Sequence, residues 1–332
     1  MLNQTPEFDK ATIAEFLQSL YGIQGSVAPL VSYEDQNVLI TAPSSTYVLK
    51  IANKRWPIEG LQMQTEILGF LASSSPQITA PDVILSKKGE AISLVNGFAV
   101  RLLSYLEGEV FTDAPKSPML FFNVGVFMGR FAAAMQPYTH PAAHRPDDLW
   151  NLDNVMACKT YIDDVQDMDT RARINRFFDY YQAHTRPKLE HLGKSVIHGD
   201  ANEQNLLVSK NVPAHIAGII DFGDMIFGST INDLATTLAY TLLGEDNPIT
   251  MAQQAIHGYA REFSLSGKER EVLFDLIAMR LVQSVTLTSN RAKQFPENDY
   301  IVVAQKPAKA LLKKLEPIVL ASEQGPPGPL IQ

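Results

Sequence analysis

The sequence predicts an α+β protein of two lobes, in which an antiparallel β-sheet lobe comes first and a larger, mainly helical lobe follows. Short β-type runs separated by turn residues fill most of the first hundred positions. Apolar residues then recur at helical spacing, beginning with a stripe from Leu120 to Phe131. The length of 332 residues is enough for two hydrophobic cores. We therefore expect lobes over 1–104 and 105–321, followed by a disordered tail rich in Gly and Pro over 322–332.

The composition narrows the class of protein. Hydrophobic residues make up 45% of the chain, which indicates a globular protein. The net charge is −8 and no long basic cluster occurs, so nucleic acid is not an expected partner. Cys158 is the single cysteine, which excludes a disulfide framework and fits a reducing compartment. We find no secretory signal and no apolar run of membrane-spanning length, and we expect a cytoplasmic protein.

The elements of the first lobe follow from turn signals and apolar spacing. An amphipathic helix should open the chain, and another should occupy residues 58–71. Asn96-Gly97 is a hairpin signal directly before the last strand. Six β-type runs occur, at 27–31, 37–42, 46–52, 81–85, 91–94 and 98–103, and we expect the run at 98–103 to be the last strand of a five-stranded antiparallel sheet.

Lys50 lies among apolar residues in the run Thr46–Ala52. A cation in the middle of such a strand is costly unless it has a partner or faces solvent. The helix over 58–71 offers Glu66 and Glu59 as partners. We favour Glu66, because its apolar neighbours place it near the packed side of that helix. A lysine that simply faces solvent is the alternative.

The stretch from Val196 to Asp224 carries the chemistry. Asp200 follows one apolar run, Asn205 precedes a second, and Asp221 follows a third. Short strands that bracket a turn usually pair, so we expect these side chains to converge. Two carboxylates and an amide are what phosphoryl transfer from a nucleotide requires, since it depends on metal ions and an oriented hydroxyl. Hairpin strands with solvated carboxylates are the alternative.

Three motifs occur here in order and at kinase spacing: His198-Gly199-Asp200, then Asn205, then Asp221-Phe222-Gly223. The chain thereby resembles the aminoglycoside phosphotransferase and choline kinase family of small-molecule kinases, and within it the hydroxylysine kinase-like and homoserine kinase-like members. The resemblance implies a protein-kinase-like fold that uses ATP and Mg²⁺. It implies that Asp200 orients the acceptor hydroxyl and accepts its proton, while Asn205 and Asp221 bind Mg²⁺.

The resemblance also assigns a nucleotide site. It implies that Lys50 steadies the phosphates, with Glu66 holding the lysine. Backbone groups at Tyr105 and Leu106 would meet the adenine. The turn at 32–37 contains no glycine, whereas protein kinases cover the phosphates with a Gly-rich loop. Ser32 and Asn37 are the candidate donors in that turn.

Candidate acceptor-binding residues lie along the second lobe. Trp150 is placed near the acceptor pocket by the resemblance, and packing within the lobe is an equal alternative. Asp224 could bind a substrate ammonium or a metal-bound water, or it could satisfy backbone donors in its turn. Arg280 or Arg291 could grip a substrate carboxylate through paired hydrogen bonds, although ordinary helix arginines are more frequent. Asp233 would brace a loop or begin a helix.

The function expected from the sequence is ATP-dependent phosphorylation of a hydroxyl on a small hydroxy amino acid or amino alcohol, by a monomer or homodimer. A kinase for aminoglycoside antibiotics is one alternative. An inactive kinase-like module that binds a nucleotide or metabolite is another. The sequence does not identify the acceptor.

Overall fold

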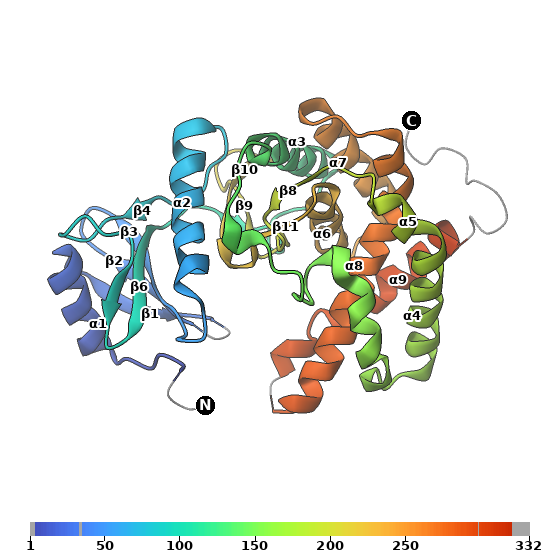
Figure 1. The fold of residues 1–332 in the computed structure, drawn as a ribbon. Helices are drawn as coiled ribbons and strands as arrows, with labels where there is room; N and C mark the ends of the chain where they lie inside the picture. The colour runs from blue at the N-terminus through green and yellow to red at the C-terminus, as the bar shows by residue number, and fades with distance from the viewer. Residues whose placement is uncertain (1–3, 33–34, 298, 321–332) are drawn as a thin grey trace. The chain divides into compact units, whose positions relative to one another are not determined.

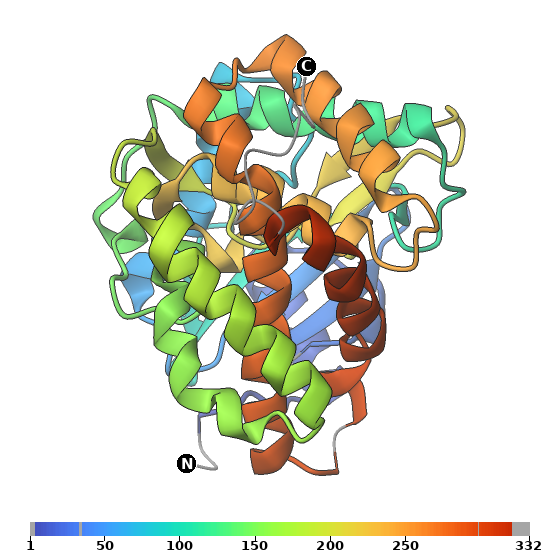
Figure 2. The same cartoon turned by 90° about the vertical axis from the view of Figure 1, so that its right-hand side faces the viewer.

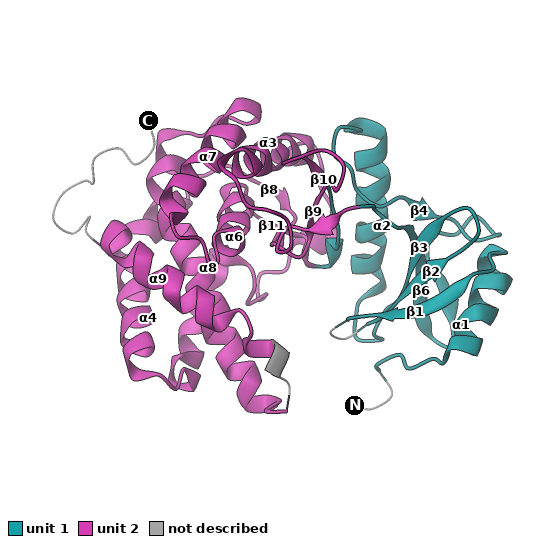
Figure 3. Cartoon of the chain, turned by 180° about the vertical axis from the view of Figure 1, so that it is seen from behind, with its two compact units in different colours: residues 1–107, 217–223 teal, residues 108–216, 224–332 magenta. Residues whose placement is uncertain are grey.

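The computed structural model describes residues 4–32, 35–297 and 299–320. The chain forms two compact units, shown in Figure 3: unit 1 contains residues 1–107 with 217–223, and unit 2 contains 108–216 with 224–332. The segment 217–223, which carries Asp221, therefore belongs to unit 1 although it lies far along the chain. The division expected from the sequence does not include this return, and the tail expected over 322–332 lies outside the described residues.

The described part of unit 1 contains a six-stranded sheet, one strand more than expected. The strand order is β1-β2-β3-β6-β4, and β5 also pairs with β6. The strand pairs β1–β2, β2–β3, β3–β6, β4–β6 and β5–β6 are antiparallel, and they place Asn37 opposite Lys50 and Lys50 opposite Arg101. The strands are β1 (Ser26–Leu30), β2 (Gln36–Thr41), β3 (Thr46–Ile51), β4 (Val83–Ile84), β5 (Ser93–Val95) and β6 (Phe98–Ser104).

The two faces of this sheet differ in character because side chains alternate along a strand. One face carries buried aliphatic residues such as Leu49 and Val100, which form a core with Phe16 of α1 (Lys10–Phe16). The other face carries Lys50 and Arg101, and Arg101 reaches Gln64 of α2 (Ile58–Ser74). Figure 1 shows the sheet between these two helices. Lys50 therefore points to the polar face of the sheet.

Helices make up most of unit 2. They are α3 (Pro118–Met135), η3 (Leu152–Asp164), α4 (Met168–Tyr180), α5 (Arg186–Leu189), α6 (Ile231–Thr241), α7 (Pro248–Glu262), α8 (Gly267–Gln294) and α9 (Gln305–Val319). Glycines let α3 and α7 pack closely: a Cβ added at Gly125 would lie 1.8 Å from the Ala255 oxygen, and one at Gly258 would lie 2.0 Å from the Phe122 oxygen. No side chain fits at either position.

Helix α8 is the buried centre of unit 2, and Figure 2 shows it running between α4 and α9. It begins with a capping box in which Ser266 and Glu269 satisfy each other's backbone donors. Helices α3 and α8 are long and apolar enough to cross a membrane, which corrects the expectation that no run of that length occurs. Most of each helix is buried inside the protein, as in the core helix of a globular domain.

Short strands frame the motif-bearing loops of unit 2. These are β7 (Glu109–Val110), β8 (Lys194–Ile197), β9 (Leu206–Val208) and β11 (Ile226–Ser229), and β10 (Ile216–Ile219) begins at the unit boundary. Strand β8 pairs with β11, and β9 pairs with β7. The strand that leads into His198 is thus paired by a strand beyond Asp224, an arrangement that turn signals alone do not predict.

Candidate active site

The loop that carries Asp200 is fixed by a buried carboxylate on α6. The two oxygens of Asp233 accept hydrogen bonds from the backbone N–H groups of His198 (2.8 Å) and Gly199 (2.9 Å). Burial raises the pKa of Asp233, and the charge of His198 together with these N–H donors opposes the shift. Of the two roles expected for Asp233, the structure shows the loop-bracing one.

Gly199 is required by the same loop. Its φ is +79°, and a Cβ there would lie 2.4 Å from the backbone oxygen of Asp224. A left-handed backbone and a blocked Cβ position both exclude larger residues. Gly199 thus packs directly against the backbone of Asp224. The same Asp224 oxygen accepts a hydrogen bond from Nη2 of Arg145 (3.1 Å).

The carboxylate of Asp200 is engaged at both oxygens. Its Oδ1 accepts from Nη2 of Arg280 at 3.1 Å. Its Oδ2 accepts from the amides of Asn202 (2.9 Å) and Asn205 (3.3 Å). Asn205 also donates to the Asp200 carbonyl at 2.8 Å, so its Nδ2 faces the loop. The structure thus brings Asp200 and Asn205 together, as the sequence predicts.

Arg280 is a buried residue of α8 with 2% of its surface exposed. Its Nη1 donates to the Trp150 carbonyl (3.0 Å) and to Oε1 of Gln283 (3.0 Å). The rings of Trp150 and Tyr240 lie 5.0 and 5.5 Å from the guanidinium carbon. Burial alone would lower the pKa of Arg280, but the influence of Tyr240 and Asp200 raises it above its usual value, so the residue stays charged.

These contacts bear on the expected acceptor-binding residues. The guanidinium of Arg280 is committed to internal acceptors, which does not favour its predicted grip on a substrate carboxylate. Trp150 is partly exposed and stacks against Arg280. Arg291 lies near the end of α8, 5.9 Å from the Phe295 ring. Binding of an acceptor by Trp150, Asp224 or Arg291 remains a prediction.

In unit 1, Lys50 forms an ion pair with Asp221: Nζ lies 2.8 Å from Oδ1. The lysine side chain is 12% exposed and the aspartate side chain 51%. Asp221 has a φ of +63°, a strained value for a residue with a Cβ. Its segment is anchored by the Ile219 amide, which donates to the Thr79 carbonyl (3.0 Å). The residue expected to bind a metal is therefore already held beside the residue expected to bind phosphate.

The position of Glu66 differs from the expectation that it lies near the packed side of its helix. It lies on the exposed side of α2, whereas Thr65, Ile67 and Leu68 are buried. Apolar neighbours in sequence do not settle the phase of a helix, because residues i and i+1 point about 100° apart. The pairing of Glu66 with Lys50 remains a prediction.

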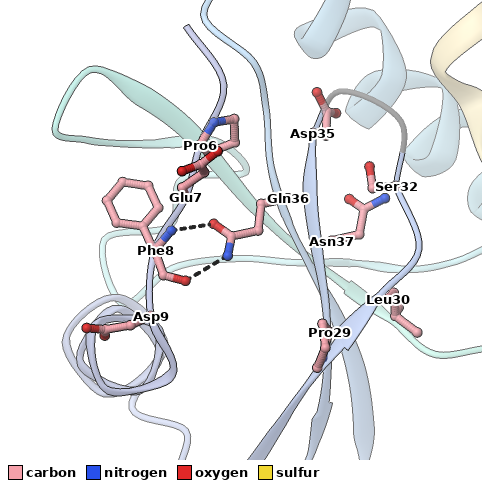
Figure 4. Close-up of a pocket in the computed structure, with 10 residues that line it drawn as sticks. All are labelled: Pro6, Glu7, Phe8, Asp9, Pro29, Leu30, Ser32, Asp35, Gln36 and Asn37. Atoms are coloured by element: carbon pink, nitrogen blue, oxygen red, sulfur yellow. Dashed lines mark hydrogen bonds between the residues drawn. The ribbon is translucent and has the colours of Figure 1, made fainter. Parts of the chain in front are cut away.

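The glycine-free turn between β1 and β2 borders a pocket of about 380 Å³, shown in Figure 4. Ser32 and Asn37 line it, and Gln36 is tied to both backbone groups of Phe8. Asp35, directly before β2, accepts from the Asn53 amide (2.9 Å) and from the Trp56 indole (3.0 Å). These bonds fix the start of β2 against the segment that follows β3.

The expected adenine-binding segment directly follows β6. The Tyr105 amide donates to the Thr46 carbonyl at 3.0 Å, so this donor is used within the sheet. Of the two backbone groups of Tyr105, the carbonyl is therefore the one left for the predicted nucleotide contact. The Leu106 side chain lies against Gly218, where a Cβ would come within 3.0 Å of it.

Comparison with known proteins decides the family. The model of a phosphotransferase enzyme family, named APH, matches residues 26–271, which is most of the chain. The chain belongs to this phosphotransferase family. Its similarity extends to hydroxylysine kinase of Mus musculus, at 27% identity over 93% of this chain and 90% of that protein, and to hydroxylysine kinase of Xenopus laevis, at 28% identity over 92% and 88%. It is a phosphotransferase whose acceptor is a hydroxyl group.

Solved structures agree on the fold. A microcompartment-associated aminopropanol kinase superposes with a TM-score of 0.72 at 17% identity, covering 96% of this chain and 99% of that one. The amicoumacin kinase hAmiN, solved in complex with AMP-PNP, Ca²⁺ and Ami, superposes with a TM-score of 0.68 at 19% identity, covering 96% and 95%. The protein-kinase-like fold expected from the sequence is confirmed.

Sequence reasoning missed two polar residues of the phosphotransferase. Arg101 is 2% exposed and donates to Oε1 of Gln64 (2.6 Å); burial lowers its pKa, and Asp35 and Asp221 oppose the shift. The sequence signal for Arg101 is a second cation in the strand that pairs with the strand of Lys50. Asn202 escaped notice because an amide two residues after an aspartate is common in ordinary turns.

Proposed function

We propose that the phosphotransferase transfers the γ-phosphate of ATP to the hydroxyl of a small hydroxy amino acid or amino alcohol resembling hydroxylysine. The observation that carries the proposal is the Asp200 carboxylate, fixed at both oxygens in a loop braced by Asp233. Phosphoryl transfer has a loose transition state in which positioning and charge stabilisation supply most of the catalysis. A rigid carboxylate suits that demand, and relatives named hydroxylysine kinase support the acceptor class.

Asp200 would orient the acceptor hydroxyl and take up its proton as the phosphoryl group moves. A general base at this step typically contributes 10²–10⁴-fold in rate. Its Oδ1 is bound to a guanidinium, which holds the carboxylate in place. Oδ2 accepts from two neutral amides, which complete the orientation of the carboxylate.

The residues present fit Mg²⁺. Asn205 turns its Nδ2 towards Asp200, which leaves its amide oxygen as the ligand atom, and Asp221 offers a half-exposed carboxylate. Both supply the hard oxygen atoms that Mg²⁺ prefers, and Mg²⁺ usually takes one or two carboxylates together with substrate phosphates and water. When bound, the ion would neutralise phosphate charge. Among the described residues no group of three or more His, Cys, Asp or Glu side chains forms a protein-only metal site.

Lys50 would bind the nucleotide phosphates. Its ion pair with Asp221 keeps the ammonium at the polar face of the sheet, where it is 12% exposed. Glu66, Ser32, Asn37, the Tyr105 carbonyl and Leu106 complete the nucleotide site that we propose. A phosphate that binds Lys50 competes with the Asp221 carboxylate, and a metal ion at Asp221 would lessen that competition.

A turnover assay tests the proposal. The purified protein is given ATP or GTP, with Mg²⁺, Ca²⁺ or chelator, and a panel of hydroxylysine, homoserine, choline, 1-amino-2-propanol and an aminoglycoside. Transfer to hydroxylysine or a small amino alcohol with ATP and Mg²⁺ supports it. Transfer to the aminoglycoside alone would replace the acceptor class. Nucleotide-dependent thermal stabilisation without any transfer would favour a binding module.

A further inference from the structure

Arg280 is the largest of the fully buried side chains in the described part of the protein, and nothing in the motif of the reaction accounts for it. It lies in the middle of α8, eighty positions from the Asp200 to which it is bonded. Burying a guanidinium is costly unless it is paired and hydrogen-bonded. The ion pair with Asp200 at 3.1 Å supplies the pairing.

The surroundings of Arg280 hold it in one orientation. Nη1 is bound to the Trp150 carbonyl and to Gln283, whose own amide donates to the Leu149 carbonyl at 2.7 Å. The rings of Trp150 and Tyr240 flank the guanidinium. Its Nε is buried and finds no hydrogen-bond partner among the described residues. The planar group is therefore fixed by packing as well as by hydrogen bonds, and it cannot turn towards another ligand without leaving these partners.

The bond from Arg280 to Oδ1 strengthens the hold on the Asp200 carboxylate. Asn202 and Asn205 both bind Oδ2 through neutral amides, and such hydrogen bonds restrain the last side-chain torsion only weakly. A charged donor at the other oxygen fixes the plane of the carboxylate. Catalytic groups need placement within about 0.5 Å and 10–20° of the productive geometry. Arg280 supplies the second of two fixed points.

We propose that Arg280 is a positioning residue for phosphoryl transfer, which acts through Asp200 by fixing the plane of its carboxylate, and that it does not bind the acceptor. This deepens the proposed function and rests on it. The substrate-carboxylate role is the competing explanation, and a purely structural role is the other. Each of the three gives a different pattern in the kinetics.

The main variant is Arg280→Lys, which keeps the charge but loses the planar fork. We expect kcat to fall about 10–100-fold, because small displacements of a catalytic group have effects of this size. KM for nucleotide and acceptor should change less than about threefold, since the interaction does not touch either. The loss should be equal for hydroxylysine and for 1-amino-2-propanol, which lacks a carboxylate. Arg270→Lys, at the start of the same helix, is the matched control, because Arg270 donates to the Leu265 carbonyl and leaves Asp200 alone.

A double-mutant cycle with Asp200→Asn separates positioning from structure. If Arg280 acts through Asp200, adding Arg280→Lys to Asp200→Asn should lower kcat by less than about threefold. An equal loss on both backgrounds would show a structural role and overturn the proposal. A rise in KM confined to hydroxylysine would also overturn it, in favour of substrate binding.

Two provisions keep the test decisive. If Arg280→Lys does not fold, Gln283→Leu, which removes one hydrogen-bond partner of Arg280, should give the same kinetic pattern with a smaller loss of kcat. If the wild-type protein phosphorylates no acceptor, the proposed function fails by itself. Urea unfolding of the wild type, the two single variants and the double variant then still tests the interaction between Arg280 and Asp200. Non-additive shifts of the unfolding midpoint support this interaction, and additive shifts contradict it.

Discussion

At the scale of single residues, Asp200 depends on a side chain from a distant part of the chain. Asp200, Asn205 and Asp221 stand at spacings that phosphoryl-transfer chemistry constrains. Arg280 is one of many arginines in helical sequence, and only the fold brings it to Asp200. The Lys50–Asp221 pair likewise joins positions 171 residues apart. Such contacts depend on tertiary packing, which local patterns do not encode.

Asp221 is the residue whose loss should be most severe for activity. Asp221→Ala should nearly abolish turnover, because it removes a proposed metal ligand and the ion-pair partner of Lys50. The fold should persist, since the side chain is half exposed. Circular dichroism and steady-state kinetics measure the two effects. Asp221→Asn is the matched control for the backbone, because Asn tolerates a positive φ while lacking the charge. Near-normal turnover of folded Asp221→Ala would remove Asp221 from the mechanism.

At the scale of elements, helices and strands were largely predictable and their pairings less so. The runs at 27–31, 37–42 and 46–52 correspond to β1, β2 and β3 within one residue at each end. The phase of α2 was misjudged at Glu66, and the partner of β8 is β11. Apolar spacing reports which residues are buried, but not which neighbouring element buries them.

The glycines at the α3–α7 contact give a prediction about helix packing. Gly258→Ala should destabilise the protein by about 1–3 kcal/mol or more, because the added methyl would lie 2.0 Å from the Phe122 oxygen and would push the helices apart. Gly69→Ala in α2 meets nothing within 4 Å and should stabilise by roughly 0.5–1 kcal/mol through helix propensity. Urea unfolding measures both. Equal effects at the two positions would contradict the close-packing explanation.

Helix α8 also carries a titrating group away from the reaction. Burial raises the pKa of Asp275 to about 7, opposed by the hydrogen bond from Thr185 and by Lys188. A carboxyl with a raised folded-state pKa favours the folded protein most when protonated. Its contribution is complete below the unfolded pKa near 4 and is lost as pH rises through 7.

Asp275→Asn should therefore gain stability relative to the wild type as pH rises from about 4.5 to 8. The gain should be about 2–4 kcal/mol, because the amide keeps an acceptor for Thr185 and does not ionise. Denaturation with urea at several pH values provides the measurement. Glu203 is a partly buried carboxyl whose pKa is also raised by burial to about 7, but it titrates in both proteins and its effect cancels in the difference. A stability difference that does not vary with pH would show that Asp275 does not titrate in this range.

At the scale of the whole molecule, the two-unit organisation was predictable but the return of 217–223 to unit 1 was not. The β-type runs in the first hundred residues and the helical spacing of apolar residues after them both predict this organisation. The return places Asp221 in unit 1 with Lys50, while Asp200 and Asn205 belong to unit 2. The sequence alone does not show that the stretch from Val196 to Asp224 is divided between the two units. The division depends on which core each short strand packs into.

Ligand binding should reveal itself in the stability of the intact protein. ATP with Mg²⁺ at about 100 times its Kd should stabilise the binding-competent state by about 2.7 kcal/mol, and the melting temperature should rise by a few degrees. Chelation with EDTA should remove most of this rise if Asn205 and Asp221 act through the metal. Differential scanning calorimetry is suitable, since it also detects units that melt separately. An unchanged rise after chelation would argue against a metal in nucleotide binding.

The two hydrogen bonds that hold the Asp200 loop to Asp233 have a consequence for protein engineering. Both bonds reach the loop from the first turn of α6, so a substitution that tilts this helix should move Asp200, the proposed general base. Variants recovered from directed evolution with changes in α6 should therefore differ in turnover for every acceptor alike. Altered acceptor preference should map to other parts of the chain.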